Sequence, residues 1–229
     1  MSFRKEEKLL INPNQVFEFK KWMNSKGFTR LYNRRAVNSL YFENISNKMF
    51  LDSEEGTVPR KKIRIRNYPG ENIECDYFLE IKISSAEGRF KDSKKINILN
   101  FNNYIKNGYS DKFYGVCIPR LQINYLREYY KFNDIRITID QKIAYTDFNN
   151  INLFYKDELN AVEVKSNFNK SVDELYSVLP FQRIRFSKYC RGYISLYGWI
   201  IFYVILNKGI TLWLKKTQPQ KKNYILMKF

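Results

Sequence analysis

The feature that most constrains the fold is the segment Arg60-Lys61-Lys62-Ile63-Arg64-Ile65-Arg66. A β-strand turns successive side chains to opposite faces, so the basic residues at 60, 62, 64 and 66 share one face. Cations at alternate positions repel one another, and such a face is stable only when it is well solvated or meets a matching polyanion. Leu79-Glu80-Ile81-Lys82 repeats the alternation with one acid and one base. The two strands together favour a ligand that combines a phosphate chain with a metal ion.

Composition narrows the class of protein further. The chain has 229 residues and a formal net charge of +17, so it can bury a sizeable core and is suited to a polyanionic partner: nucleic acid, an acidic membrane or polyphosphate. It contains no histidine, which excludes Ser/His/Asp and Cys/His catalysis and leaves carboxylates to hold any metal, as Mg²⁺ or Mn²⁺ prefer. Three separated cysteines and an N-terminus without a signal peptide predict a reduced, cytoplasmic protein.

Periodicity predicts an α+β protein. Asn12-Pro13 offers a helix start, and apolar residues at helical spacing predict a first helix from about Pro13 to Lys26. Shorter helices are expected within Ile96–Ile105 and from Ser171 to Leu179, closed by Pro180. Alternation predicts strands at Arg4–Ile11, Ala36–Phe42, Lys61–Tyr68, Tyr77–Ser84, Leu121–Tyr129, Ile135–Ile139 and Ala161–Val164.

The C-terminal part differs from the rest of the chain. Ile194–Leu206 is almost wholly apolar, and after Asn207-Lys208-Gly209 a second apolar run ends at Leu214. Lys208 and Gly209 interrupt the stretch, so a docked or buried helix is favoured over a membrane span or interfacial anchor. We therefore expect one domain over residues 1–192 and a hydrophobic segment with a basic tail over 193–229. Contact with the inner face of a membrane through 194–214 stays open, and the tail after Lys215 is expected to be disordered.

Nearly every predicted strand has one charged and one apolar face. An open antiparallel sheet with one side in water would explain any single strand. The helices need an apolar sheet face to pack on, however, and the charges are mostly Arg and Lys at corresponding positions. We therefore predict a closed antiparallel β-barrel, a tunnel with helices packed outside and charges turned inward. Phosphates would neutralise such a lumen, and its few carboxylates would hold a divalent metal.

At this point the residues resemble a known family, the VTC domain, which is the polyphosphate polymerase branch of the triphosphate tunnel metalloenzymes in the CYTH-like superfamily. The resemblance covers residues 3 to about 192, in the family's order. It rests on eight segments: Arg4-x-Glu6-x-Lys8, Ser39-Leu40-Tyr41-Phe42 with the acid Glu43, Arg60–Arg66, Leu79–Lys82, Tyr125-x-Arg127, Arg136–Asp140, Glu163-Val164-Lys165 and Phe186–Tyr189.

The resemblance implies a metal-dependent phosphotransferase that moves the γ-phosphate of ATP onto a polyphosphate chain with Mn²⁺ or Mg²⁺. By position it implies catalytic phosphate ligands at Lys8, Arg64, Arg66, Arg127, Arg136 and Lys188. Further substrate contacts are expected at Lys62, Lys82, Lys165, Lys91 and Lys94. Glu163 is the main expected metal ligand, with Glu6 and Glu80 as weaker candidates.

Three other functions fit part of the pattern. Water in place of the chain end would make the same tunnel a triphosphatase or polyphosphate hydrolase. A non-catalytic polyphosphate-binding protein would keep the basic residues and lose the metal acid, whereas Glu163 is present. A nucleic-acid binder would need exposed rings near basic residues, and Tyr125, Tyr129 and Tyr130 are the candidates. Tyrosines that alternate within strands are more often wall residues, so no nucleic-acid partner is expected.

Overall fold

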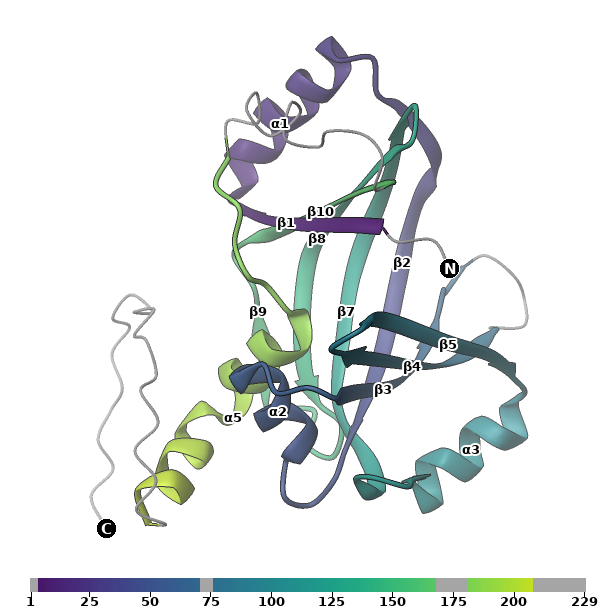
Figure 1. Ribbon diagram of the computed structural model, residues 1–229, viewed down its shortest axis with the longest axis vertical. Coiled ribbons are helices and arrows are strands. Elements are labelled where there is room, and N and C mark those ends of the chain that lie inside the picture. Colours follow the sequence, from purple (N-terminus) through teal and green to yellow (C-terminus); the bar gives the residue numbers. More distant parts are fainter. Residues whose placement is uncertain (1–3, 71–75, 168–180, 208–229) are drawn as a thin grey trace. The chain divides into compact units, whose positions relative to one another are not determined.

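The computed structural model describes residues 4–70, 76–167 and 181–207 (Figure 1). The chain divides into two compact units, Met1–Leu196 and Tyr197–Phe229. The first unit contains one antiparallel sheet with helices packed on it. Helix α5 (Lys188–Asn207) begins in the first unit and ends in the second.

The sheet is strongly curled around three long central strands, β8 (Ile135–Asp147), β7 (Gly115–Phe132) and β2 (Thr29–Glu43) (Figure 1). On one side of this centre lie β10 (Asn160–Asn167) and then β1 (Arg4–Ile11). On the other side lie β3 (Arg60–Asn67), β4 (Tyr77–Ser85) and β5 (Gly88–Ile96). Two short strands extend the sheet, β6 (Tyr109–Asp111) on β7 and β9 (Phe154–Lys156) on β8.

Helix α1 (Pro13–Ser25) covers the apolar face of β1, β10 and β8. Asn12 caps it by accepting a hydrogen bond from the Gln15 amide, while the Gln15 side chain accepts from the Asn12 amide. The buried side chains of the helix lie at positions 16, 19 and 23, one face of a helical turn. They pack with Leu9, Ile137, Ile139, Val162 and Val164 from the three strands. The apolar positions of these strands therefore point away from their charged positions.

A second apolar cluster lies behind β2, β3 and β4. Ile63 and Ile65 of the basic strand are buried there with Leu40, Phe42 and Leu79. Helix α3 (Ile98–Asn107) packs Phe101 and Ile105 against this cluster, and helix α2 (Lys48–Glu55) contributes Met49. Helices α1, α2 and α3 thus cover the outer, apolar face of the curled sheet, and the charged face is the inner one.

The predicted closed barrel is wrong. In the described residues β1 and β5 are the two edges of the path of strands, and they do not pair with each other. Residues Arg89 to Lys95 of β5 are exposed throughout, and a strand with two polar faces suits a sheet edge. The free side of β1 meets the chain after residue 181, where the Ile184 amide donates to the Lys8 carbonyl. The fold is therefore an α+β half-barrel.

Most predicted elements are confirmed, although several are longer than expected. The first helix, the helix near Ile96–Ile105 and all seven predicted strands are present. Strands β2, β7 and β8 extend well beyond the predicted ranges, and α2, β5, β6 and β9 were not predicted. The predicted helix from Ser171 to Leu179 and the tail after Lys215 lie outside the described residues. Cys117 and Cys190 are buried free thiols, as expected.

The helices were compared with the length and apolar character of membrane-spanning helices. Among residues 4–70, 76–167 and 181–207, no helix combines the length and the apolar character that a membrane crossing needs. Contact of residues 194–214 with a membrane stays a prediction, and its last residues, from 208 on, lie outside the described part of the chain.

Candidate active site

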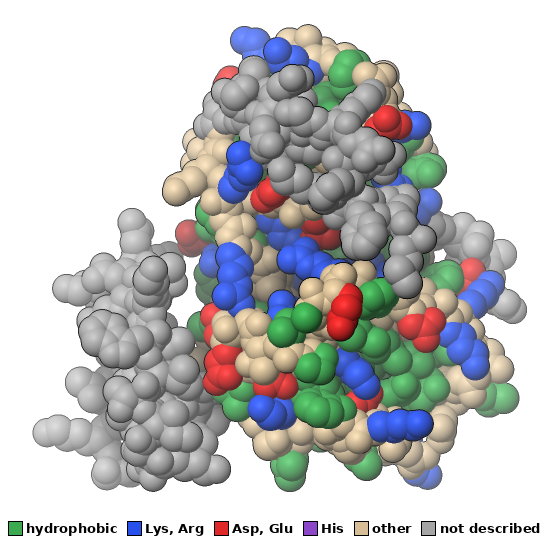
Figure 2. Space-filling model, in the orientation of Figure 1, with side chains coloured by type: hydrophobic (Ala, Val, Ile, Leu, Met, Phe, Trp, Pro, Cys, Tyr) green, Lys and Arg blue, Asp and Glu red, His purple; other side chains and the backbone are tan. Residues whose placement is uncertain are grey.

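The inner face of the sheet carries the charged positions of β3. Arg64 is directly paired with Tyr41 of β2 and Glu80 of β4, and Arg66 is paired with Ser39 of β2. Directly paired residues of antiparallel strands share a face, so all of these side chains point inward. Figure 2 shows Lys and Arg side chains, with some acidic ones, in a hollow near the centre of the view. The basic ladder therefore lies on the inner face of the curled sheet.

Glu80 holds the two arginines in place. Its carboxylate accepts from Arg64 Nε at 2.7 Å and lies 3.7 Å from Arg66 Nη1, and Lys91 binds its other oxygen. Arg64 and Glu80 are only 6% and 3% exposed, so these contacts are shielded from water. Burial would raise the pKa of Glu80, but Arg64 and Arg66 outweigh it and lower the pKa to about 2. Glu80 is thus a fixed anion that orients cations.

Hydroxyl groups complete the arginine environment. Arg64 Nη1 donates to Tyr41 at 2.7 Å, and Arg66 donates to Ser39 at 3.2 Å and to Tyr125 at 3.1 Å. Burial favours the neutral phenol of Tyr41, yet Arg64 and Arg66 lower its pKa below the ordinary value. Both guanidinium groups are therefore held rigidly before any ligand binds.

A third arginine lies on β7 beside the C-terminal helix. Arg127 makes a two-pronged contact with Asp140 of β8, with Nε at 2.6 Å and Nη2 at 2.8 Å. Lys188, the first residue of α5, lies 2.5 Å from the same carboxylate. Burial of Asp140 opposes ionisation, but Arg127 and Lys188 lower its pKa below the ordinary value. Asp140 therefore joins β7, β8 and α5 at the charged face.

The metal candidates Glu163 and Glu6 lie together on β10 and β1. Lys165 Nζ is 2.7 Å from a Glu163 oxygen and 3.8 Å from a Glu6 oxygen, and Lys8 Nζ is 3.1 Å from Glu6. Burial would raise the pKa of Glu163, but Lys165, Arg127 and Lys8 hold it well below the ordinary value. The sheet thus presents two carboxylates in contact with Lys165 and Lys8.

The charged face extends to the other predicted residues with one exception, Lys94. The Lys82 side chain is exposed, yet the neighbouring charge of Arg64 lowers its pKa well below the ordinary value. Glu163 and Glu6 oppose this effect. Lys62 donates to Ser187 at 2.9 Å. Arg136 is exposed at the edge of the same face, paired with Lys165. Lys94 pairs with Leu79 on the outer face. Glu80 and Lys91 lie on the charged face and contact each other there.

The two carboxylates offer a partial fit for a divalent metal. Glu163 and Glu6 are oxygen donors of the kind that Mg²⁺ and Mn²⁺ prefer, and both are now paired with lysines. The described residues contain no group of three or more acidic or thiol ligands. Phosphate oxygens would have to supply the remaining ligands, which suits a site that takes metal and phosphate together. Glu80 contacts Arg64 and Lys91 rather than these two carboxylates, and its role as a metal ligand stays a prediction.

Sequence reasoning missed the tyrosines that separate the cations. The charges of Arg64, Arg127 and Lys188 lie 5.1 to 5.5 Å from the ring centres of Tyr41 or Tyr125. The ring faces attract these cations and keep them apart. The signal was present in the alternation, because Tyr41 and Tyr125 occupy the inward positions of their strands. Tyr125 and Tyr130 are buried, which agrees with a wall role and not with stacking on nucleic acid.

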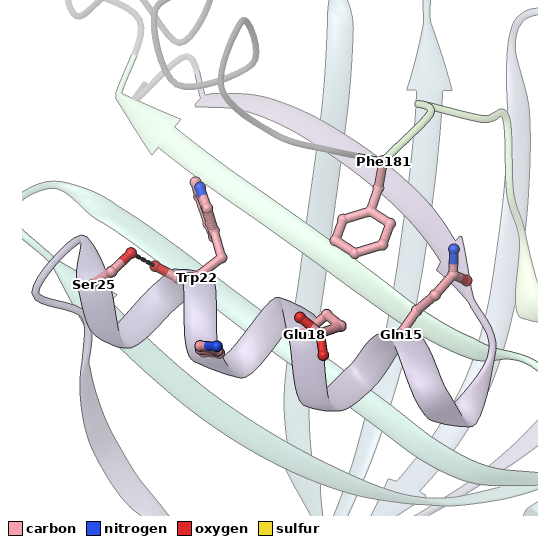
Figure 3. A pocket seen from close by; sticks show the side chains of 6 residues that line it. Gln15, Glu18, Trp22, Ser25 and Phe181 are labelled. Carbon is pink, nitrogen blue, oxygen red and sulfur yellow. Dashed lines mark hydrogen bonds between the residues drawn. The ribbon is translucent and has the colours of Figure 1, made fainter.

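Another cavity lies away from the charged face. It has a volume of about 530 Å³ and is lined by one side of α1 and by Phe181 (Figure 3). Gln15, Glu18, Trp22 and Ser25 contribute its helical wall. It holds none of the predicted site residues, so it is not the candidate active site.

Comparison with known proteins agrees with the geometry. The family model of the VTC domain matches residues 3–197. No curated protein matches the chain. Among solved structures, a putative adenylate cyclase from Bacillus halodurans is similar with a TM-score of 0.53 and 10% identity, covering 81% of this chain and 94% of that one. Its likeness supports the fold alone.

Two further solved structures are more distant. A putative adenylate cyclase from Vibrio parahaemolyticus has a TM-score of 0.49 and 11% identity, with 81% of this chain and 95% of that chain covered. The RNA triphosphatase Pct1 from S. pombe has a TM-score of 0.30 and 11% identity, with 92% and 77% covered.

Proposed function

The chain belongs to the VTC domain family, within the triphosphate tunnel superfamily, and from this premise we propose that it is a metal-dependent polyphosphate polymerase. The proposed reaction transfers the γ-phosphate of ATP onto the end of a polyphosphate chain. The observation that carries the proposal is the set of three buried or half-buried arginines, Arg64, Arg66 and Arg127, on one concave face with Glu163.

The proposed chemistry needs positioned charge rather than a covalent nucleophile. A terminal oxygen of the polyphosphate chain attacks the γ-phosphorus, the bond to the β,γ-bridging oxygen breaks, and the nucleoside diphosphate leaves with that oxygen. Negative charge on the transferred phosphoryl group is stabilised by donors that are already in place. Arg64 and Arg66 are suited to this role because Glu80, Tyr41, Ser39 and Tyr125 fix their orientation.

The remaining side chains take roles by position. Lys82, Lys62 and Lys165 would neutralise neighbouring phosphates, with Lys8, Lys188 and Arg136 extending the basic surface. Glu163 and Glu6 would hold a divalent ion, which would supply positive charge against the phosphates when bound. Release of Lys165 from the carboxylates to phosphate would accompany that binding, since the same lysine now contacts both acids.

A triphosphatase or polyphosphate hydrolase is the second candidate. The half-barrel favours it in one respect, because solvent reaches Lys82 on the charged face and water could serve as the acceptor. Both reactions use the same arginines and the same carboxylates, so only the products separate them.

Incubation of the purified protein with ATP and Mn²⁺ or Mg²⁺ tests the proposal. We expect polyphosphate on a gel and little orthophosphate by colorimetry. Arg66→Gln should lower the rate at least about tenfold, because a charge-assisted contact is worth roughly 1.5–3 kcal/mol. Arg30→Gln is the matched control, since Arg30 lies on the outer side of the sheet near Glu128. Formation of orthophosphate alone would establish the hydrolase. Formation of neither product would favour a non-catalytic binding protein.

A further inference from the structure

Three tyrosines surround one arginine at the end of the charged face. The guanidinium carbon of Arg35 lies 5.2 Å from the ring centre of Tyr32, 5.6 Å from that of Tyr68 and 5.5 Å from that of Tyr129. Tyr32 and Tyr129 also meet edge to face at 5.5 Å. We name these four residues the tyrosine-arginine cluster. Such a group offers planar surfaces and one delocalised cation.

The cluster continues the arginine path on β2, β7 and β3. Arg35 of β2 is directly paired with Arg127 of β7, and the Arg127 charge lies 5.9 Å from the Tyr129 ring. On β3 the inward positions run from Arg64 through Arg66 toward Tyr68. The Tyr68 ring lies 6.2 Å from that of Phe78, which pairs with Arg66. Four residues of strand span roughly 13 Å, so the path from Arg64 to Tyr68 is long enough for a bound triphosphate.

Exposure and chemistry change along this path. Arg64 and Arg66 are only 6% and 7% exposed, whereas Tyr32 is 53% exposed. The arginine part has carboxylates and hydroxyls that fix donors for phosphate oxygens, while the cluster has three aromatic rings around a single cation. A further phosphate would find one charge there, but a planar heteroaromatic group would find rings and a guanidinium plane to stack on.

We propose that the tyrosine-arginine cluster binds the nucleobase of the nucleoside triphosphate whose phosphates lie along Arg127, Arg66 and Arg64. The inference rests on the proposed function, because the triphosphate must occupy that path for its base to reach Tyr32. Stacking discriminates little among bases, so ATP and GTP should bind with similar affinity. The base end would face the more open side, and the terminal phosphate would face Arg64.

Calorimetric titration of the full chain tests this assignment with two probes, a non-hydrolysable ATP analogue and inorganic tripolyphosphate, each with Mg²⁺. Tyr32→Ala should weaken binding of the ATP analogue about tenfold and change the affinity for tripolyphosphate less than about twofold. Arg66→Gln should weaken both probes. Tyr155→Ala is the matched control, because Tyr155 is a part-exposed tyrosine on β9 that stacks on Tyr145. It should change neither.

The outcomes separate the cluster from the function on which it rests. If Tyr32→Ala lowers the affinity for both probes equally, the cluster binds phosphate and the nucleobase assignment is overturned. An unchanged affinity for both probes would also overturn the nucleobase assignment. A wild-type protein that binds tripolyphosphate as tightly as the ATP analogue would overturn the nucleobase assignment alone. A wild-type protein that binds neither probe would overturn the proposed function as well.

Discussion

At the scale of single residues, the inner face contains cations that are fixed by anions and phenols of the chain itself. Alternation in Arg60–Arg66 correctly predicts that Arg64 and Arg66 share a face. It does not predict that Glu80 lies against both, because the contact depends on the register of β3 against β4. Glu163 lies on β10, which the central strands β8, β7 and β2 separate from β4 in the order of the sheet. Residue types alone made three acids look alike, and the pairing of strands distinguishes them.

The different positions of Glu80 and Glu163 lead to a testable difference in metal dependence. We expect Glu80→Gln to lower the turnover number about tenfold, since Arg64 loses a charged hydrogen bond worth roughly 1.5–3 kcal/mol. Glu163→Gln should instead raise the Mn²⁺ concentration needed for half-maximal rate. Steady-state rates over a Mn²⁺ series measure both effects. If high Mn²⁺ restores the rate of Glu80→Gln, Glu80 is a metal ligand.

Glu43 should make stability depend on pH. It is 2% exposed and accepts from the amides of Asn44, Met49 and Phe50 and from Tyr189. Burial outweighs these bonds and raises its pKa from 4.5 to about 7. The folded state therefore binds this proton more tightly. The contribution of Glu43 to stability is fully present below about pH 4.5 and is lost as the pH rises through 7. The loss by pH 8 is on the order of 3 kcal/mol.

Urea unfolding of the wild type and Glu43→Gln at pH 5.5 and pH 8 measures this effect. We expect the wild type to lose stability between the two pH values and Glu43→Gln to lose much less. Glu55→Gln, an exposed change on α2, is the control and should follow the wild type. Acids with lowered pKa, such as Glu80, act below about pH 4.5 and do not contribute in this range. Parallel pH profiles for wild type and Glu43→Gln would contradict the prediction.

At the scale of elements, the first turns of α5 lie against the inner face of the sheet. Tyr189 stacks on Tyr41 at 5.1 Å, and Arg191 binds Asp157 in the β9–β10 connection with Nη2 at 2.8 Å. Gly192 faces the ring of Tyr145, which is fully buried. A Cβ at this position would overlap that ring. The close approach explains why a glycine stands inside an otherwise regular helix.

Gly192→Ala should therefore loosen α5 from the sheet. Overpacking of a buried contact typically costs about 1–3 kcal/mol, against a gain in helix propensity of roughly 1 kcal/mol. We expect a lower melting temperature and faster proteolytic cleavage near the start of α5, measured by calorimetry and limited proteolysis. Ser195→Ala changes an exposed position of the same helix and should leave both unchanged. A stabilised Gly192→Ala protein would mean that the helix shifts without cost.

The elements that the sequence did not reveal share a physical cause. β5 is polar on both faces, so it has no alternation to detect. α2 is eight residues long and has no capping side chain at Asn47; its first amides donate to the side chains of Asn44 and Glu43 instead. Both elements depend on neighbours more than on their own pattern. The strongly periodic elements, α1 and β3, were predictable because each has one apolar face.

At the scale of the whole molecule, excess positive charge on a concave face should make stability depend on anions. Tripolyphosphate that binds the folded state as proposed should raise the melting temperature, and at one hundred times its dissociation constant the gain is about 2.7 kcal/mol. A thermal-shift series with tripolyphosphate measures this. Sulfate at equal ionic strength is the control for screening, and Arg66→Gln should reduce the shift. An equal shift with sulfate would mean that the face has no preference for linked phosphates.

The class of fold was predictable at this scale, but its closure was not. Alternating strands with apolar outer faces indicate a curled sheet covered by helices, and the structure has one. Whether the two edges meet depends on long-range distances and on the partner that each edge strand finds. β1 is partly covered by the segment around Ile184, and β5 is protected by its charges.

The pairing of β1 with β10 has a consequence for biosynthesis. Within the strands of the sheet β1 pairs with β10, so Glu6 and Lys8 cannot meet Glu163 and Lys165 until the ribosome has added more than 150 further residues. At typical elongation rates this takes on the order of ten seconds. During that interval the nascent chain already contains the basic strand β3 but has no carboxylate pair. We infer that the basic residues of β3 are synthesised well before Glu6 and Glu163 can come together.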